Sequence, residues 1–293
     1  MYVRDELHFR TINEYIDSIG VKDKQEHDRL LSLYQQMIIE LPAFIYSVDL
    51  DHPMERNKFV IPNHFMTNSF KWNPFHRWEV DRDKARSASS RYPWNKKEPK
   101  IFWRGGDSGF TYEYVDDVFK DLPKYFQRME LVWQSHQHPD LIDAMFSAIN
   151  DPDKRRIAEL GMPEKAQMSF ADVSDHIKYK YLISIDGWTA AWLRPNWIMA
   201  SNSLLIKQES RKVEWFSYLL KPYVHYYPVG NDLSGMLEAI PYLEAHEDEA
   251  LKIISEANKF VDVHWTPGAM TKAICDLFRN YSRVQTEERN KHD

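Results

Sequence analysis

The sequence has little cysteine. Cys275 is the single cysteine among 293 residues. One thiol cannot form an intramolecular disulfide, and it cannot supply a cysteine-based zinc site. The chain therefore suits a reducing compartment.

Excess positive charge and long apolar runs are also missing. The formal net charge of −6 argues against a nucleic-acid-binding protein that neutralises phosphates. No apolar run reaches the roughly 18 residues of a membrane span, and the first residues, MYVRDELHFRTINEY, lack a signal-peptide core. We therefore expect a soluble, cytoplasmic protein that binds no nucleic acid. The length is about twice that of a common domain, which predicts two domains.

Residues 178–207 combine the features of a nucleotide-binding unit: KYKYLISIDGWTAAWLRPNWIMASNSLLIK. The pattern predicts a strand, a turn at Asp186-Gly187, and a helix that starts with Thr189, Ala190 and Ala191 and carries Arg194 one turn along. A second strand then ends at Lys207. Free N–H groups at a helix start and an arginine nearby favour phosphate. An ordinary βαβ unit with a surface arginine is the competing interpretation.

A second candidate phosphate loop follows a short strand at residues 101–103. It comprises Arg104, Gly105, Gly106, Asp107 and Ser108. Backbone amides of a glycine-rich loop can close on a phosphate, although a plain turn explains the pattern as well.

Candidate catalytic carboxylates follow the apolar run 43–48, which is predicted to be a buried strand. Asp49 and Asp51 come at its carboxyl end, before His52-Pro53. Either is a candidate general base; solvated loop aspartates and a metal-binding Asp-x-Asp are the alternatives.

Residues 54–100 show little periodicity and are predicted to be mostly irregular. Their aromatic and basic pairs, Arg77-Trp78 and Trp94 with the lysines after it, suit either stacking on a sugar or anchoring as partly buried side chains.

Elsewhere, helices are expected at 26–40, 111–133, 213–220, 245–262 and 269–281. A strand is expected at 222–229, followed by a helix around Leu237 and Ile240 that Asp232 caps. His136 and His138 read as surface residues because no third ligand joins them. The alternation of strands and helices predicts an α/β protein.

An ordered series of these motifs resembles glycosyltransferase family 90, which includes the protein O-glucosyltransferases and the capsule-associated, lipopolysaccharide-modifying enzymes. The order and spacing of the motifs hold from about residue 75 to residue 265. The residues that carry the resemblance are Arg77-Trp78, Pro93-Trp94, Phe102 to Gly105 with Asp107-Ser108, His138 to Asp143, Lys178 to Tyr181, Ile185 to Gly187 with Ala190-Ala191 and Arg194, Ser203 to Lys207, and Lys221 to Leu233.

The resemblance implies a GT-B fold, in which two Rossmann-like domains face a cleft. We expect an acceptor-side domain at 1–97, onto which a C-terminal helix within 269–293 packs back, and a nucleotide-sugar domain at 98–268. The loops at 104–108 and 187–194, with Asp186 and Lys207, would surround a UDP-sugar, and the resemblance implies no cofactor and no metal. His52, Arg77, Trp78 and Trp94 are cleft candidates on the acceptor side.

The resemblance also implies a mechanism. Asp51 fits the family's Asp-aromatic-Pro segment, although Ala43 and Val48 depart from the family pattern and leave Asp49 as the alternative base. The expected reaction is inverting transfer of glucose, xylose or a related sugar to a glycan, a lipid-linked saccharide or a protein; contact with a membrane surface stays open. A non-catalytic nucleotide-sugar-binding protein and a metal-dependent Asp-x-Asp transferase are the other interpretations.

Overall fold

The computed structural model describes residues 44–45, 47–49, 59–60, 74–107, 127–149, 169–187, 190–191, 193–210, 212–214, 216–266, 268–269, 272–273 and 276. Side chains of residues 44–49, 59–60, 74–78 and 213 are outside this description. The predicted helices at 26–40 and 269–281 lie wholly or mainly outside it. No helix within these ranges is long and apolar enough to cross a membrane.

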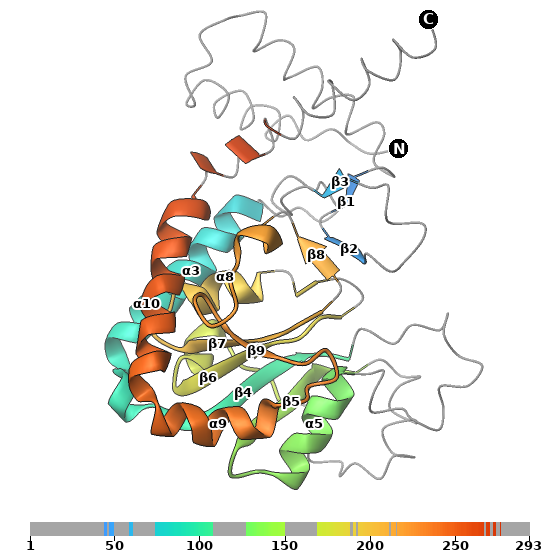
Figure 1. Ribbon diagram of the computed structural model, residues 1–293, viewed down its shortest axis with the longest axis vertical. Helices are drawn as coiled ribbons and strands as arrows, with labels where there is room; N and C mark the ends of the chain where they lie inside the picture. Colours follow the sequence, from blue (N-terminus) through green and yellow to red (C-terminus); the bar gives the residue numbers. More distant parts are fainter. Residues whose placement is uncertain are drawn as a thin grey trace, which may run out of the picture.

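A parallel five-stranded sheet forms the centre of the molecule (Figure 1). Its spatial order is β5-β4-β6-β7-β9, and every neighbouring pair is parallel. The strands are β4 (Glu98–Gly106), β5 (Ile142–Ala148), β6 (Tyr179–Ser184), β7 (Leu204–Gln208) and β9 (Tyr227–Val229). Such sheets are covered on both faces, which explains why β6 is a nearly continuous run of buried residues. The predicted α/β class is confirmed.

Helices cover both faces of this sheet (Figure 1). They are α3 (Pro74–Arg91), α5 (Gln127–Gln137), α7 (Val173–His176), α8 (Arg194–Met199), α9 (Met236–Ala245) and α10 (Glu247–His264). Helices α5, α9 and the first half of α10 close the main core with Ile101, Trp103, Tyr181 and Ile183. Helices α3, α7 and α8 pack together on the other face, where Asn258 of α10 donates to the carbonyls of Met199 and Ser201.

Two short ladders lie outside the central sheet. β1 (Phe44–Ile45) pairs in parallel with β3 (Phe59–Val60), and β2 (Ser47–Asp49) pairs antiparallel with β8 (Lys212–Glu214). The predicted strand at 43–48 is thus two strands that pair with different partners. Two 3-10 turns, η3 (Trp94–Lys96) and η7 (Ser217–Leu219), complete the described elements.

The largest error of the sequence analysis is at residues 54–100, where α3 replaces the expected irregular structure. The helix turns Asp81, Ala85 and Ala88 inward, and both alanines are fully buried. The buried stripe has helical spacing but consists of small residues and one aspartate, so a search for large apolar side chains misses it. Although α3 belongs to the predicted acceptor-side domain, it packs on α7 and α8.

Three smaller expectations are also wrong. Residues 213–220 contain strand β8 and the turn η7 instead of a helix, because pairing with the distant β2 overrides local spacing. Residues 222–229 form a strand only from Tyr227, since Tyr223 has a left-handed backbone, with φ of 60°. Helix α9 is preceded by Gly235 at φ 80°, while Asp232 accepts from the Ser234 amide instead of capping the helix.

Candidate active site at the carboxyl ends of the strands

The sheet opens between β4 and β6. The β4–β5 ladder continues to Gly106 and Ala148, whereas the β4–β6 pairing ends at Phe102 and Leu182. The two strands that follow β4 in the chain, β5 and β6, lie on opposite sides of it in the sheet. This is the topological switch point, and open α/β sheets bind their ligands in the crevice beyond it.

Two arginines from different helices hold these strand ends. Arg128 of α5 donates to the carbonyls of Gly106 at 2.9 Å, Ile185 at 3.2 Å and Asp186 at 3.0 Å. Arg194 of α8 donates through Nη2 to the carbonyl of Arg104. Arg128 therefore bridges β4 and the segment after β6 where their ladder has ended, and Arg194 holds β4 to α8.

These arginines concentrate positive charge at the switch point. The guanidinium carbon of each lies 5.7 Å from the ring centroid of Trp103. Burial, followed by the charge of Arg128, lowers the pKa of Arg194 to about 9. Burial lowers the pKa of Arg128 to about 10, against the opposing effect of Asp186 and Asp107. Both groups remain cations at neutral pH, which favours an anionic ligand here.

Arg194 makes no ion pair with a carboxylate in the described part of the chain. Its other described polar contact is with the ring of His176, where Nη1 lies 3.4 Å from Nε2. The Nδ1 atom of His176 is 2.9 Å from the carbonyl of Asp172. A neutral imidazole protonated at Nδ1 satisfies both contacts, because Nε2 then accepts from the guanidinium.

The turn after β6 differs from the predicted helix start. Helix α8 begins at Arg194 and has Pro195 in its first turn, so Arg194 is not one turn along. Ala190 and Ala191 precede the helix in a buried turn, which the Ala191 amide closes by donating to Asp186 Oδ1 at 3.0 Å. The Arg194-Pro195 pair was the available signal, because proline favours a first helical turn. A six-residue helix adds little dipole, so the guanidinium groups carry the attraction for phosphate.

Gln208 fixes this turn from the neighbouring strand. Its Oε1 accepts from the Asp186 amide at 3.0 Å, and its Nε2 donates to the carbonyl of Asn231 at 2.9 Å. The side chain is 3% exposed. It thus joins the ends of β6 and β7 to the loop after β9, a role that the sequence analysis did not find.

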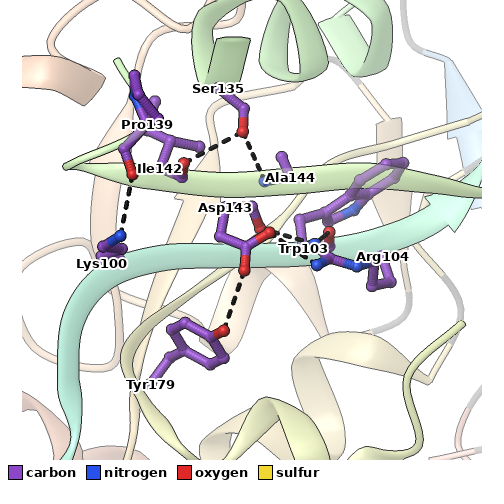
Figure 2. A network of polar contacts seen from close by, with 9 residues as sticks. All are labelled: Lys100, Trp103, Arg104, Ser135, Pro139, Ile142, Asp143, Ala144 and Tyr179. Carbon is purple, nitrogen blue, oxygen red and sulfur yellow. Dashed lines mark hydrogen bonds and ion pairs between the residues drawn. The ribbon is translucent and has the colours of Figure 1, made fainter. Parts of the chain in front are cut away.

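Arg104 is held within the sheet (Figure 2). Its Nη2 donates to Asp143 Oδ1 at 2.7 Å, and the Tyr179 hydroxyl donates to Asp143 Oδ2 at 3.0 Å. The guanidinium also lies 4.3 Å from the ring centroid of Phe102. The Arg104 side chain is therefore paired with a carboxylate of the neighbouring strand. Donor contact by Arg104 stays a prediction.

The glycines after Arg104 have different surroundings. A Cβ atom on Gly105 would lie 2.4 Å from Cζ2 of Trp103, so the buried indole requires glycine there. Among the described residues, a Cβ atom on Gly106 would approach only the carbonyl oxygen of Ala148, at 4.0 Å. Asp107 is buried beside them, and Ser108 lies outside the described residues.

Strands β7 and β8 bring further side chains to the same region. Lys212 donates through Nζ to the carbonyl of Gly187. Lys207 donates to the carbonyl of Gln208 at 3.0 Å, and its Nζ lies 5.3 Å from the ring centroid of Tyr226. Burial, together with Asp186, raises the pKa of Glu214 well above its usual value. Sequence reasoning expected a helix at 213–220 and singled out neither Lys212 nor Glu214.

The acceptor-side candidates are described less fully. Asp49 ends β2, and its backbone partner is Lys212. Asp51, His52 and Thr189 lie outside the described residues. The backbone of Arg77 and Trp78 belongs to α3.

Trp94 is not brought to the strand ends. It precedes the amino end of β4, where its indole donates to Glu247 and its ring meets Tyr181 edge-on at 6.0 Å. Within the described ranges, no group of three or more His, Cys, Asp or Glu side chains is placed to hold a metal ion.

Comparisons with known proteins show the family of this chain. The model of "Glycosyl transferase family 90" matches residues 21–293. Protein O-glucosyltransferase 2 of Danio rerio is 31% identical over 200 residues, 68% of this chain and 36% of that protein. Human protein O-glucosyltransferase 1 is 28% identical over 207 residues, 71% of this chain and 47% of that protein. The chain thus spans less than half the length of these relatives.

One solved structure illustrates the more distant likenesses. A protein of Anabaena crystallised with UDP matches at a TM-score of 0.45 and 12% identity, over 87% of this chain and 77% of that protein. The family match covers nearly the whole sequence and does not depend on this structure. The chain belongs to glycosyl transferase family 90.

Proposed function

We propose that this protein is a glycosyltransferase that moves glucose, xylose or a related sugar from a UDP-sugar to a hydroxyl group of its acceptor, with inversion at the anomeric carbon. The acceptor is a glycan, a lipopolysaccharide-type or other lipid-linked saccharide, or a protein. Family membership supports the reaction class, and the names of the O-glucosyltransferase relatives support glucose as the first sugar to test.

The observation that carries the proposal is the pair of buried arginines at the switch point. Arg128 and Arg194 place two cations beside Trp103, and Arg194 lacks a carboxylate partner within the described residues. A diphosphate supplies the missing negative charge. As the glycosidic bond breaks, negative charge develops on the departing UDP, and fixed cations stabilise that charge most in the transition state.

The base is Asp51, with Asp49 as the alternative. The β2–β8 ladder supports a base from this segment, because it puts Asp49 at the end of β2 next to a strand whose Lys212 contacts the donor-side turn. The carboxylate takes the proton of the acceptor hydroxyl as its oxygen attacks the anomeric carbon opposite UDP. One displacement gives inversion. The cytoplasmic location expected from the sequence stays a prediction.

A thermal-shift screen tests the donor. UDP, UDP-glucose and UDP-xylose should each raise the unfolding temperature, whereas a purine sugar nucleotide such as GDP-mannose should not. A ligand at about 100 times its dissociation constant stabilises by about 2.7 kcal/mol. UDP release on adding a donor with candidate acceptors then measures catalysis. A stabilising UDP-sugar that is never hydrolysed or transferred identifies the alternative, a nucleotide-sugar-binding protein.

A metal-dependent reaction through Asp49 and Asp51 is the second alternative. We expect EDTA to leave turnover unchanged, because two arginines supply the charge that a divalent ion would otherwise supply. Loss of turnover in EDTA, restored by manganese or magnesium, would establish the metal site instead.

A further inference from the structure

Glu214 is a buried carboxyl group without a described role. Its side chain comes from β8 and the residue is 6% exposed. The amide of Glu214 donates to Ser217 Oγ at 2.8 Å, but within the described part of the chain the carboxyl group has no hydrogen-bond or ion-pair partner. The two carboxyl oxygens are not among the fully enclosed polar atoms that lack a partner, so they are accessible to a ligand, and a largely buried acid of this kind commonly has a functional reason.

The location of Glu214 is fixed by its neighbours. Residues two apart on a strand point to the same face, so Glu214 shares a face with Lys212, whose Nζ contacts the carbonyl of Gly187. The charged groups that act on Glu214 are Asp186 and Lys207, which stand at the carboxyl ends of β6 and β7. Glu214 therefore belongs to the same edge of the sheet as Arg128 and Arg194.

The neighbouring polar groups are already engaged. Asp186 Oδ1 accepts from the Ala191 amide, and Lys207 donates to the carbonyl of Gln208. Neither contact involves the carboxyl group of Glu214. A ligand that enters the crevice is thus the partner that would satisfy it.

The chemistry of that partner follows from charge. An anionic phosphate is repelled by carboxylates, and Asp186 already stands beside Glu214. Burial and Asp186 favour the uncharged acid form of Glu214. A carboxyl group of this kind both donates and accepts hydrogen bonds, and hydroxyl groups do the same. Two neighbouring hydroxyls can engage its two oxygens together.

We propose that Glu214 binds neighbouring hydroxyl groups of the sugar nucleotide and so helps to select a hydroxyl-bearing donor. The inference rests on the proposed function, because it takes a UDP-sugar as the ligand of this edge. The hydroxyls belong either to the ribose of UDP or to the transferred sugar. A site built to hydrogen-bond a hydroxyl strongly rejects an analogue that lacks it, because the buried group is then left unpaired.

Calorimetric titrations with four probes test this proposal. UDP, 2′,3′-dideoxy-UDP, UDP-glucose and inorganic diphosphate are titrated into wild type, Glu214→Met and Glu256→Met. Methionine is similar in size to glutamate but forms no comparable hydrogen bond, whereas glutamine would still donate and accept as the neutral acid does. Glu256 provides a matched control, because it is a carboxylate on α10 that pairs with Lys259. Glu214→Met should weaken the ligands whose hydroxyls Glu214 binds by about tenfold or more, the effect of losing one hydrogen bond to such a group. Diphosphate affinity should stay unchanged, and Glu256→Met should behave as wild type.

The probes separate the two sources of hydroxyls. If ribose is bound, UDP loses affinity in Glu214→Met, and wild type prefers UDP to its dideoxy analogue. If the transferred sugar is bound, UDP is unaffected and only UDP-glucose loses affinity. Equal weakening of all four probes, or no weakening of any, overturns the role of Glu214.

Wild type alone supplies a second test that does not depend on the folding of the variant. Equal wild-type affinity for UDP and the dideoxy analogue, with UDP-glucose no tighter than UDP, also overturns the role. Failure of wild type to bind any uridine nucleotide contradicts the proposed function itself.

Discussion

Asp49 and Lys212 are backbone partners in the antiparallel β2–β8 ladder. Lys212 continues the connection through its side chain, since Nζ donates to the carbonyl of Gly187 in the turn after β6. One strand pair and one lysine therefore join the segment that carries the candidate bases to the edge that carries the candidate donor site. These residues are more than 130 positions apart in sequence, as the numbering shows.

The ladder also separates the two candidate bases. Asp49 is its last residue, whereas Asp51 lies two residues beyond. We predict that Asp51→Asn lowers the transfer rate at saturating donor by about 10² to 10⁴, the contribution typical of a general base. UDP affinity should not change, because asparagine keeps the shape but cannot accept the proton.

Asp49→Asn serves as the matched control and should lower the rate less than about tenfold. Rate measurements that rank the two variants in the opposite order would assign the base to Asp49. Little effect from either variant would mean that the base lies elsewhere in the chain.

Sequence patterns predicted the parts of the site that local composition determines. The apolar run of β6, the turn at Asp186-Gly187 and the second strand β7 are found as expected, because a parallel strand buried on both faces needs a continuous apolar run. The stripe of Ala85 and Ala88 in α3 was missed, since small residues give little hydrophobic contrast.

Long-range pairing limits what a sequence can show. The inward position of Arg104 depends on Asp143 in the neighbouring strand. The role of Arg128 depends on strand ends that its own helix does not contain. The spacing of residues around Arg104 and Arg128 in the sequence predicts neither of these contacts.

The two glycines after Arg104 give a prediction about stability. Gly105→Ala should destabilise the fold by on the order of 1 to 3 kcal/mol, because its Cβ atom would overlap the fully buried indole of Trp103. Gly106→Ala should fold normally, since its Cβ atom meets only one described atom, at 4.0 Å. Chemical denaturation of both variants measures the difference. Equal stability of the two would show that Trp103 moves aside at little cost.

His176 predicts a pH dependence of stability. Burial, followed by the charge of Arg194, lowers the pKa of His176 in the folded protein to about 3, compared with about 6.5 for an unfolded histidine. Below pH 6.5 the unfolded chain binds a proton that the folded protein does not. The stabilisation that depends on neutral His176 is therefore fully present above pH 6.5. The free energy of unfolding falls from there toward pH 3, by about 1.4 kcal/mol per pH unit between those values.

Urea unfolding at pH 7 and pH 5 checks this prediction. The free energy of unfolding of wild type should fall by about 2 kcal/mol more between these pH values than that of His176→Gln, which keeps a polar side chain but does not titrate. Carboxylates such as Asp172 and Asp175 titrate in both proteins and cancel in the comparison. An identical loss in the two proteins would mean that His176 is protonated in the folded state.

The central claim is that guanidinium groups at the β4–β6 opening bind the diphosphate of a UDP-sugar, and the UDP affinity of Arg194→Ala tests it most directly. Arg86→Ala is the matched control, because Arg86 forms a surface ion pair with Asp262. Calorimetry should show that Arg194→Ala loses about 1.5 to 3 kcal/mol of binding free energy, as expected for a lost charged hydrogen bond. Arg86→Ala should bind UDP as wild type does. A folded Arg194→Ala protein with unchanged UDP affinity would contradict the account.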